Sequence, residues 1–221
     1  MMVNLSASTS TMLEEHMSID ICDLQRKLCS SQISPYASAL SGIIEQFSNA
    51  LSSTNPLSKI LSIYDNYRDL HSNISVHEVL DSLRQAFTLY ADGGLHLLYI
   101  RQENEAWFPK IILTSELILN DIHMLDDSIT IYRGCDQSEL LSNKYGQAWS
   151  TSIQAANLFD AIYNRWFADA YTHYASQSWF NPSNRIVLTA FIERKDIFFS
   201  DQNVEYEVVV DTSKLKNVKL V

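Results

Sequence analysis

The sequence predicts an α+β fold, because helical patterns fill its first part and strand patterns its second. Up to Gly94, apolar residues recur at the three- and four-residue spacing of amphipathic helices. After Gly94, short runs rich in β-branched and aromatic residues alternate with polar turns. One long helical pattern, over residues 153–176, interrupts these strand patterns. Helices followed by strands, rather than a regular alternation of the two, are typical of α+β proteins.

Four amphipathic helices are expected before Gly94. The fourth has the clearest ends: Ser75 begins a capping-box pattern with Glu78, and a pair of glycines would stop the helix. The expected segments lie around 19–28, between Pro35 and the SSTNP turn at 52–56, over 57–67 and over 75–94.

The chain is expected to divide into three parts. Residues 1–15 are Ser/Thr-rich and aperiodic, which predicts a flexible N-terminus. Residues 16–92 would form a helical region that packs on the core or binds a partner, and residues 93–221 would form the core itself. A chain of 221 residues is long enough to bury a sizeable core.

Six short runs after Gly94 are predicted to be strands. They are LHLLYI (95–100), KIILT (110–114), SITIYRG (128–134), QAWSTS (147–152), RIVLTAFIE (185–193) and YEVVVD (206–211). The helix between the fourth and fifth runs carries its apolar residues on one stripe, and Ser152 is its expected N-cap. Its aromatic residues are interpreted as core side chains, with a platform for stacking bases as the alternative.

Composition excludes several classes of protein. The formal net charge of −10 argues against broad binding to nucleic acid or anionic membranes, without excluding a local basic groove. No apolar run reaches the roughly 18 residues of a membrane span, and the N-terminus lacks the features of a signal peptide. Three cysteines without metal-ligand spacing indicate a reducing, cytoplasmic environment and three small core fillers. The histidines are scattered without ligand spacing, so no metal site is expected.

Polar residues stand at the ends of three predicted strands, and each has an ordinary explanation. Arg133 could be an exposed strand-end charge. The hydroxyl triplet 150–152 could end a strand and cap the next helix. Glu205 and Glu207 alternate with Tyr206, so they would share one side of the strand and could keep an exposed edge strand soluble.

Taken in order, YRG (132–134), STS (150–152) and EYE (205–207) resemble the motifs of the arginine–serine–glutamate class of mono-ADP-ribosyltransferases. The stretch AANLF after STS and the stretch leading into VVV at 208–210 support the likeness, which covers roughly residues 95–221. The resemblance implies an ADP-ribosyltransferase-like split β-sandwich core with NAD as substrate and no metal. The interval between Arg133 and Ser150 is short, which leaves little room for an elaborate loop over NAD.

The resemblance also implies catalytic roles for the two glutamates and a serine. Glu207 would hydrogen-bond the nicotinamide ribose and stabilise an oxocarbenium-like transition state. Glu205 would orient and deprotonate the acceptor. Ser150 would position Glu207 and shape the nicotinamide pocket.

The implied NAD-binding set includes residues of the first two motif segments and of the helix that follows them. Arg133 would hold a phosphate as a bidentate fork, and the backbone of Gly134 would face the nicotinamide amide. Thr151 belongs to this set beside Ser150, although its ordinary role, with its neighbour Ser152, is to support the turn. Phe159 falls where the family often has an aromatic residue near the nicotinamide, but it also lies on the apolar stripe of the helix.

Several functions stay open at this stage. Glu205 favours a protein arginine as the acceptor, as expected for an intracellular toxin or effector. A base of RNA or DNA is the alternative acceptor, in a toxin–antitoxin or phage-defence enzyme. An antitoxin or another protein could bind the N-terminal helices. The alternative hypothesis to an enzyme is a non-catalytic interaction protein that keeps the fold. No membrane partner is expected.

Overall fold

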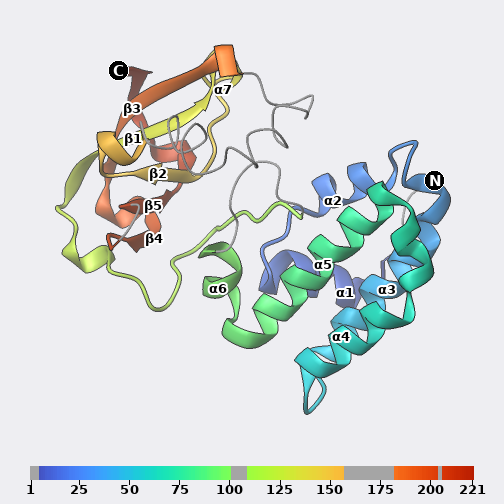
Figure 1. Cartoon of the computed structure of the whole chain (residues 1–221). Helices are drawn as coiled ribbons and strands as arrows, with labels where there is room; N and C mark the ends of the chain where they lie inside the picture. The colour runs from blue at the N-terminus through green and yellow to red at the C-terminus, as the bar shows by residue number, and fades with distance from the viewer. Residues whose placement is uncertain (1–4, 101–108, 157–181, 204–205) are drawn as a thin grey trace. The chain divides into compact units, whose positions relative to one another are not determined.

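The computed structural model describes residues 5–100, 109–156, 182–203 and 206–221. The chain forms two compact units, Met1–Ile112 and Leu113–Val221. Helices fill the first unit, whereas the described residues of the second form a six-stranded antiparallel sheet (Figure 1). The predicted α+β class is therefore confirmed. The boundary between the units follows Ile112, later than the expected division at 92/93.

The helices of the first unit follow the predicted pattern. They are α1 (Ala7–Thr11), a π-helical turn (Met12–His16), α2 (Ile21–Leu28), α3 (Ala37–Ala50), α4 (Pro56–Asn66), α5 (Ile74–Gly93) and α6 (Leu95–Ile100), with 3-10 turns at Ser34–Tyr36 and Arg68–Ser72. The core between them contains Phe47 and Phe87, whose ring centroids lie 5.4 Å apart. The apolar stripes predicted for α2, α3 and α5 are therefore largely buried, whereas α4 buries Ile60 and Ile63 and leaves the predicted Leu61 46% exposed.

The N-cap of helix α5 lies two residues before the one that the capping-box pattern predicts. The side chain of Asn73, rather than Ser75, is the N-cap, and its Oδ1 accepts a hydrogen bond from the backbone N of Val76 at 3.2 Å. Asparagine caps a helix as well as serine does, so two candidates two residues apart could not be ranked from sequence. Gly94 ends the helix as expected, at a positive φ of 74°.

The first residues of the chain differ from the predicted flexible N-terminus. From Ala7 on they are helical, and Thr9 and Leu13 are buried. Glu45 on α3 accepts hydrogen bonds from the backbone and hydroxyl of Ser6 and from the hydroxyl of Thr9. The Ser/Thr-rich composition therefore supplies donors that attach α1 to α3.

Two of the predicted strands are wrong. Residues 95–100 form helix α6, because leucine favours helices and the run is too short to distinguish the two structures. Leu98 and Tyr99 of this helix are buried. Within 110–114, only Ile111 pairs, in an isolated antiparallel bridge with Ile19.

The sheet contains the other four predicted strands and two more. The strands are β1 (Ser128–Asp136), β2 (Ala148–Ser150), β3 (Arg185–Glu193), β4 (Ile197–Asp201), β5 (Glu207–Val210) and β6 (Lys216–Leu220). A short turn of helix, Ile122–Met124, precedes β1, and others lie between the strands: α7 (Gln137–Ser142), Pro182–Asn184, Arg194–Asp196 and Thr212–Lys214. The spatial order is β4-β5-β2-β1-β3-β6.

The sheet has two halves, which meet between β2 and β1; this junction is called the seam. Strand β1 pairs with β3 along its whole length, but with β2 only through Tyr132 and Ser150. The apolar side chains of both halves nevertheless contribute to one buried cluster, which includes Ile131, Trp149, Leu188, Val208 and Val210. One core therefore supports both halves.

The cysteines only partly fill the core as predicted. Cys135 on β1 is fully buried, whereas Cys22 and Cys29 are exposed. Both exposed residues lie on or next to α2, which turns Leu24 and Leu28 inward instead. Among the described residues, no helix is both long and apolar enough to cross a membrane.

The helix predicted over 153–176 can be followed only at its start. Residues 153–156 are helical, and Ser152 caps them, because its Oγ accepts a hydrogen bond from the backbone N of Ala155 at 3.3 Å. The predicted N-cap is therefore confirmed. The aromatic stripe of this helix, including Phe159, lies outside the described residues.

Candidate functional site

The three motif strands are neighbours in the sheet, in the order β5-β2-β1. Ser150 lies directly opposite Glu207 on one side and opposite Tyr132 on the other. Directly opposite residues of antiparallel strands point to the same face. The structure therefore brings Ser150 and Glu207 together on one face, at the seam, although the chain separates them by most of the second unit.

Strand β5 is an interior strand, which removes the edge-strand explanation of the acidic pair. It lies between β4 and β2, and Val208, Val209 and Val210 are fully buried. Glu207 is the first residue of the strand and is half-buried. A carboxylate at this position does not serve to keep an exposed edge soluble.

The prediction that Glu205 and Glu207 share one side of a strand assumes a regular strand through Tyr206, and this assumption needs a correction. Strand β5 starts at Glu207, and the preceding Tyr206 has a φ of 54°, in the left-handed region that a bulky residue rarely occupies. The strict alternation that would align the two glutamates therefore does not extend across Tyr206. Glu205 itself lies outside the described residues.

The hydroxyl triplet after β2 is bound into the turn. Ser150 is 4% exposed, and its Oγ accepts a hydrogen bond from the backbone N of Ser152 at 3.0 Å. The backbone N of Thr151 donates to the carbonyl of Tyr206 at 2.8 Å, and its hydroxyl donates to Oε1 of Gln202 at 2.6 Å. These contacts join the end of β2 to the chain that leads into β5.

Tyr132, Ser150 and Glu207 form one row across the three strands, and Arg133 directly follows Tyr132 in β1. Since successive side chains of a strand alternate, it belongs to the opposite face, with Ile131 and Cys135. Its guanidinium is already held by protein groups. Nε and Nη2 donate to the carboxylate of Glu139 at 2.9 and 2.7 Å, and Nη1 donates to the carbonyl of Ala148 at 2.7 Å.

The ion pair between Arg133 and Glu139 is largely buried, with the two side chains 12% and 13% exposed. Glu139 also accepts a hydrogen bond from the backbone N of Gly146 at 3.0 Å. A Cβ on Gly146 would lie 2.3 Å from Nη2 of Arg133, so only glycine allows the guanidinium this place. The bidentate fork that the resemblance assigns to a phosphate is thus engaged by a carboxylate.

Gly134 lies in β1 opposite Val187, and its carbonyl accepts a hydrogen bond from Nη2 of Arg185 at 3.3 Å. Glu139 and Gln202 were not predicted as site residues, although both contact predicted ones. Glu139 lies on α7, a helix too short to produce a periodic pattern, and Gln202 lies in a polar stretch that resembles an ordinary loop.

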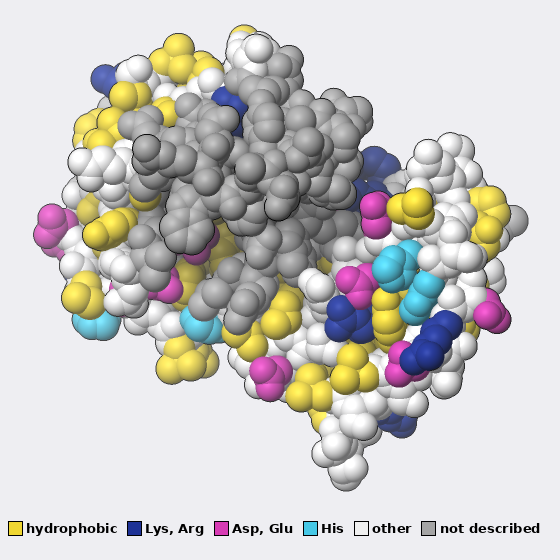
Figure 2. Space-filling model, viewed as in Figure 1, with side chains coloured by type: hydrophobic (Ala, Val, Ile, Leu, Met, Phe, Trp, Pro, Cys, Tyr) yellow, Lys and Arg dark blue, Asp and Glu magenta, His cyan; other side chains and the backbone are white. Residues whose placement is uncertain are grey.

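Charged side chains of the described residues are scattered over the face drawn in Figure 2, with basic and acidic groups interspersed. On the helical unit, the rings of His71 and His77 lie 4.8 Å apart, a contact that their spacing did not predict. The hydroxyl of Tyr64 is 3.0 Å from Nε2 of His77. Burial raises the pKa of Tyr64, and the nearby carboxylate of Asp81 raises it further. Among the described residues, no group of three or more His, Cys, Asp or Glu side chains is placed to hold a metal.

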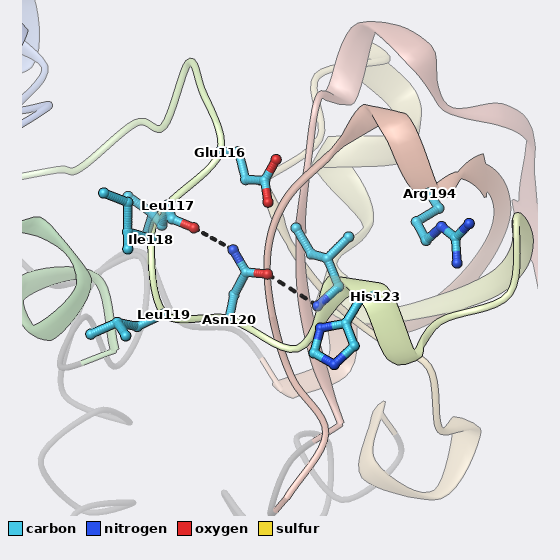
Figure 3. A pocket seen from close by; sticks show the side chains of 8 residues that line it. Glu116, Leu117, Ile118, Leu119, Asn120, His123 and Arg194 are labelled. Carbon is cyan, nitrogen blue, oxygen red and sulfur yellow. Dashed lines mark hydrogen bonds between the residues drawn. The ribbon is translucent and has the colours of Figure 1, made fainter.

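A groove in the sheet unit lies beside the segment that precedes β1. It is lined by Glu116, Leu117, Ile118, Leu119, Asn120, Ile122, His123 and Arg194. Figure 3 shows Ile118 and Leu119 on one side of the loop and Arg194 on the other. The segment is bound to the outer edge of β4, because the backbone N atoms of Leu117 and Asp121 donate to carbonyls of that strand. No lining residue belongs to the row of Ser150 and Glu207, so the groove is separate from the candidate site.

Comparison with known proteins adds no relative. No family model matches the chain, and no curated protein or solved structure matches it either. The geometry of the sheet unit is therefore the basis for a functional proposal.

Proposed function

We propose that the chain is an NAD-dependent mono-ADP-ribosyltransferase, with an ADP-ribosyltransferase-like core in the unit Leu113–Val221. One observation carries the proposal. The arginine, serine and glutamate motifs lie on three adjacent strands, with Ser150 opposite Glu207. A catalytic set of these residues requires that arrangement, which their positions along the chain do not impose.

The proposed reaction breaks the bond between nicotinamide and C1′ of its ribose. The electron pair of that bond leaves with nicotinamide, and C1′ gains positive charge. The carboxylate of Glu207, held at a strand end beside the buried Ser150, would stabilise that charge and hydrogen-bond the ribose hydroxyl. An acceptor nitrogen then bonds to C1′ and gives its proton to Glu205.

The NAD-binding residues fit this proposal unequally. Ser150 and Gly134 lie on the two strands at the seam, within reach of a ligand bound there. Arg133 fits less well, because it lies on the opposite face of the sheet from Ser150 and Glu207, and the Nε–Nη2 edge of its guanidinium is already engaged by Glu139. Thr151 serves the turn through its bonds to Tyr206 and Gln202.

We propose a protein arginine as the acceptor, on the basis of Glu205, which suits a toxin or effector. A base of RNA or DNA is the alternative acceptor. The interspersed charges of the described surface in Figure 2 offer no extended basic footprint on that face for a nucleic acid.

The test is incubation of the purified chain with NAD labelled in the adenosine part, in the presence of cell lysate. Nicotinamide release and label in protein or nucleic acid are measured after nuclease or protease treatment. Glu207→Ala is expected to lower nicotinamide release at least about 100-fold, because it removes the group that stabilises the transition state. Glu205→Gln should keep NAD cleavage and lose transfer to arginine.

The matched control is Glu193→Gln, at the exposed end of β3, where the carboxylate pairs with Lys195 and Lys216. It should cleave NAD at the unmodified rate. Equal rates for Glu207→Ala and the unmodified chain would reject the enzyme and favour the non-catalytic alternative. Label that survives protease but not nuclease would replace protein arginine by a nucleic acid base as the acceptor.

A further inference from the structure

Gln202, between β4 and β5, bonds to both of these strands and to the turn after β2, at the end of the sheet where Ser150 and Glu207 lie. Its Nε2 donates to the hydroxyl of Ser200 at 3.1 Å and to the backbone carbonyl of Glu207 at 3.2 Å. Its Oε1 accepts from the hydroxyl of Thr151 at 2.6 Å. Its backbone N donates to Oδ2 of Asp121 at 2.9 Å.

This network uses both donors and the acceptor of the amide, and it is partly shielded from water. Ser200 is 1% exposed, and Thr151 and Gln202 are half-buried. A buried polar group that loses its partner costs more than the bond itself contributed. The strand ends around Gln202 are therefore held in one arrangement rather than in several.

The two strands bound by the amide carry the proposed catalytic pair. Thr151 directly follows Ser150, the last residue of β2, and on β5 the accepting carbonyl belongs to Glu207 itself. Thr151 also donates its backbone N–H to Tyr206, the left-handed residue before Glu207. Gln202 thus stabilises the contact between Thr151 and the residues that lead into β5, where Glu207 lies.

Gln147 provides an internal comparison at the other end of the same strand pair. Its Nε2 donates to the carbonyls of Leu113 and Val210 at 2.7 and 3.4 Å, and its Oε1 accepts from the backbone N of Leu113 at 2.8 Å. The chemistry is the same, a side-chain amide joining the β2–β5 pair to a neighbouring segment. Gln147 differs in bonding backbone groups alone, and in its greater distance from Ser150 and Glu207 along the strands.

We propose that Gln202 is a positioning residue of the active site, which fixes the relative placement of Ser150 and Glu207 through Thr151 and the backbone of β5. The proposal rests on the proposed function for its kinetic consequence, but its structural consequence stands separately. It predicts that loss of the amide changes kcat while leaving the affinity for NAD nearly unchanged.

The experiment compares Gln202→Ala with Gln147→Ala in nicotinamide release, below the unfolding temperature of both variants. Gln202→Ala should lower kcat by about 10- to 100-fold with KM for NAD within about 3-fold, because misplacing a catalytic group by about 1 Å costs up to 100-fold. Gln147→Ala should keep kcat within about 2-fold. Equal kcat losses in the two variants would overturn the proposal, since they would show a general structural effect.

Thr151 gives a second test that survives a folding failure of Gln202→Ala. Thr151→Val removes the hydroxyl bonded to Gln202 and should lower kcat about as much as Gln202→Ala, whereas Thr151→Ser keeps that hydroxyl and should lower kcat less. The Thr151→Val and Gln202→Ala losses should be strongly non-additive in the double variant, because both break the same bond. Additive losses, or an active Thr151→Val, would contradict the proposed coupling.

Amide hydrogen exchange separates this inference from the proposed function. Gln202→Ala should accelerate exchange at the amide of Thr151 at least about 10-fold and leave the amide of Leu113 near its original rate, and Gln147→Ala should do the reverse. If the unmodified chain does not cleave NAD, the proposed function fails, and this exchange pattern alone supports or overturns the role of Gln202 in holding the strand ends.

Discussion

At the scale of single residues, the candidate site depends on groups that have no catalytic chemistry of their own. Gly146 is the clearest example. Its φ is not in the left-handed region, so its role is to leave space and not to permit an unusual turn. That space is filled by the guanidinium of Arg133, which Glu139 and the carbonyl of Ala148 hold in place.

Gly146→Ala is expected to destabilise the sheet unit. The added Cβ would overlap Nη2 of Arg133 at 2.3 Å and push the guanidinium out of its buried pair, at a cost of about 1–3 kcal/mol. Denaturant unfolding measures the loss. Gly42→Ala is the control: nothing lies within 4 Å of its new Cβ, and alanine in the interior of α3 should stabilise by about 0.5–1 kcal/mol. The same loss for Gly146→Ala in an Arg133→Met background would show that the overlap is not the cause.

The predictability of the site also differs residue by residue. The meeting of Ser150 and Glu207 was predictable, because both motifs stand at strand ends and the resemblance places them together. Glu139 and Gln202 were not, since their roles come from contacts that only the folded sheet creates. A glutamate on a six-residue helix and a glutamine in a polar turn look like ordinary surface residues in a sequence.

At the scale of elements, the attachment of α1 to α3 shows how a short helix is held. A five-residue helix has little stability of its own, so its place depends on Glu45 and on buried residues such as Leu13. Burial acts to raise the pKa of Glu45, but hydrogen bonds from Thr9 and Ser6 outweigh it, and the pKa lies below its ordinary value.

Acid is therefore expected to release α1. The contribution of Glu45 to stability is fully present above its unfolded-state pKa of about 4.3 and is lost as the pH falls through the lower folded-state value. The amide signals of Thr9 and Ser10 in NMR spectra between pH 7 and 3 report this change. Glu45→Gln should remove the Glu45-dependent titration from these amides. A titration of the same midpoint and size in that variant would assign it to another carboxylate.

Prediction of the elements succeeded where the pattern was long. Helices α3 and α5 have 14 and 20 residues, enough for a periodic stripe to be distinguished from chance. The strand prediction for residues 95–100 was wrong because a run of six residues is too short to distinguish a strand from a helix. Strand β6 was missed because lysines and an asparagine dominate its exposed edge.

At the scale of the whole molecule, the chain has two units with separate cores. Phe47 is fully buried in the first, and Leu188 is fully buried in the second. The α+β class was predictable from the order of the patterns, but the boundary after Ile112 was not. The segment before it forms a bridge with Ile19, which assigns it to the helical unit through a contact distant in sequence.

Each core is expected to govern the stability of its own unit. Phe47→Ala should destabilise the helical unit by about 3–5 kcal/mol, and Leu188→Ala should destabilise the sheet unit by about 2–5 kcal/mol, since each leaves a cavity. Hydrogen exchange resolved by residue measures both units in each variant. If either substitution lowered the protection of both units equally, the chain would unfold as one cooperative body.

The arrangement of Arg133, Glu139 and Gly146 has a consequence for how this sequence can diverge. A descendant that lost Glu139 would keep a largely buried guanidinium without its carboxylate, and one that gained a side chain at 146 would displace the guanidinium. Substitutions at these three positions are therefore expected to be coupled, each more costly alone than together with changes at the other two. A distant relative can be recognised by this linked variation even where the three short motifs have drifted beyond recognition.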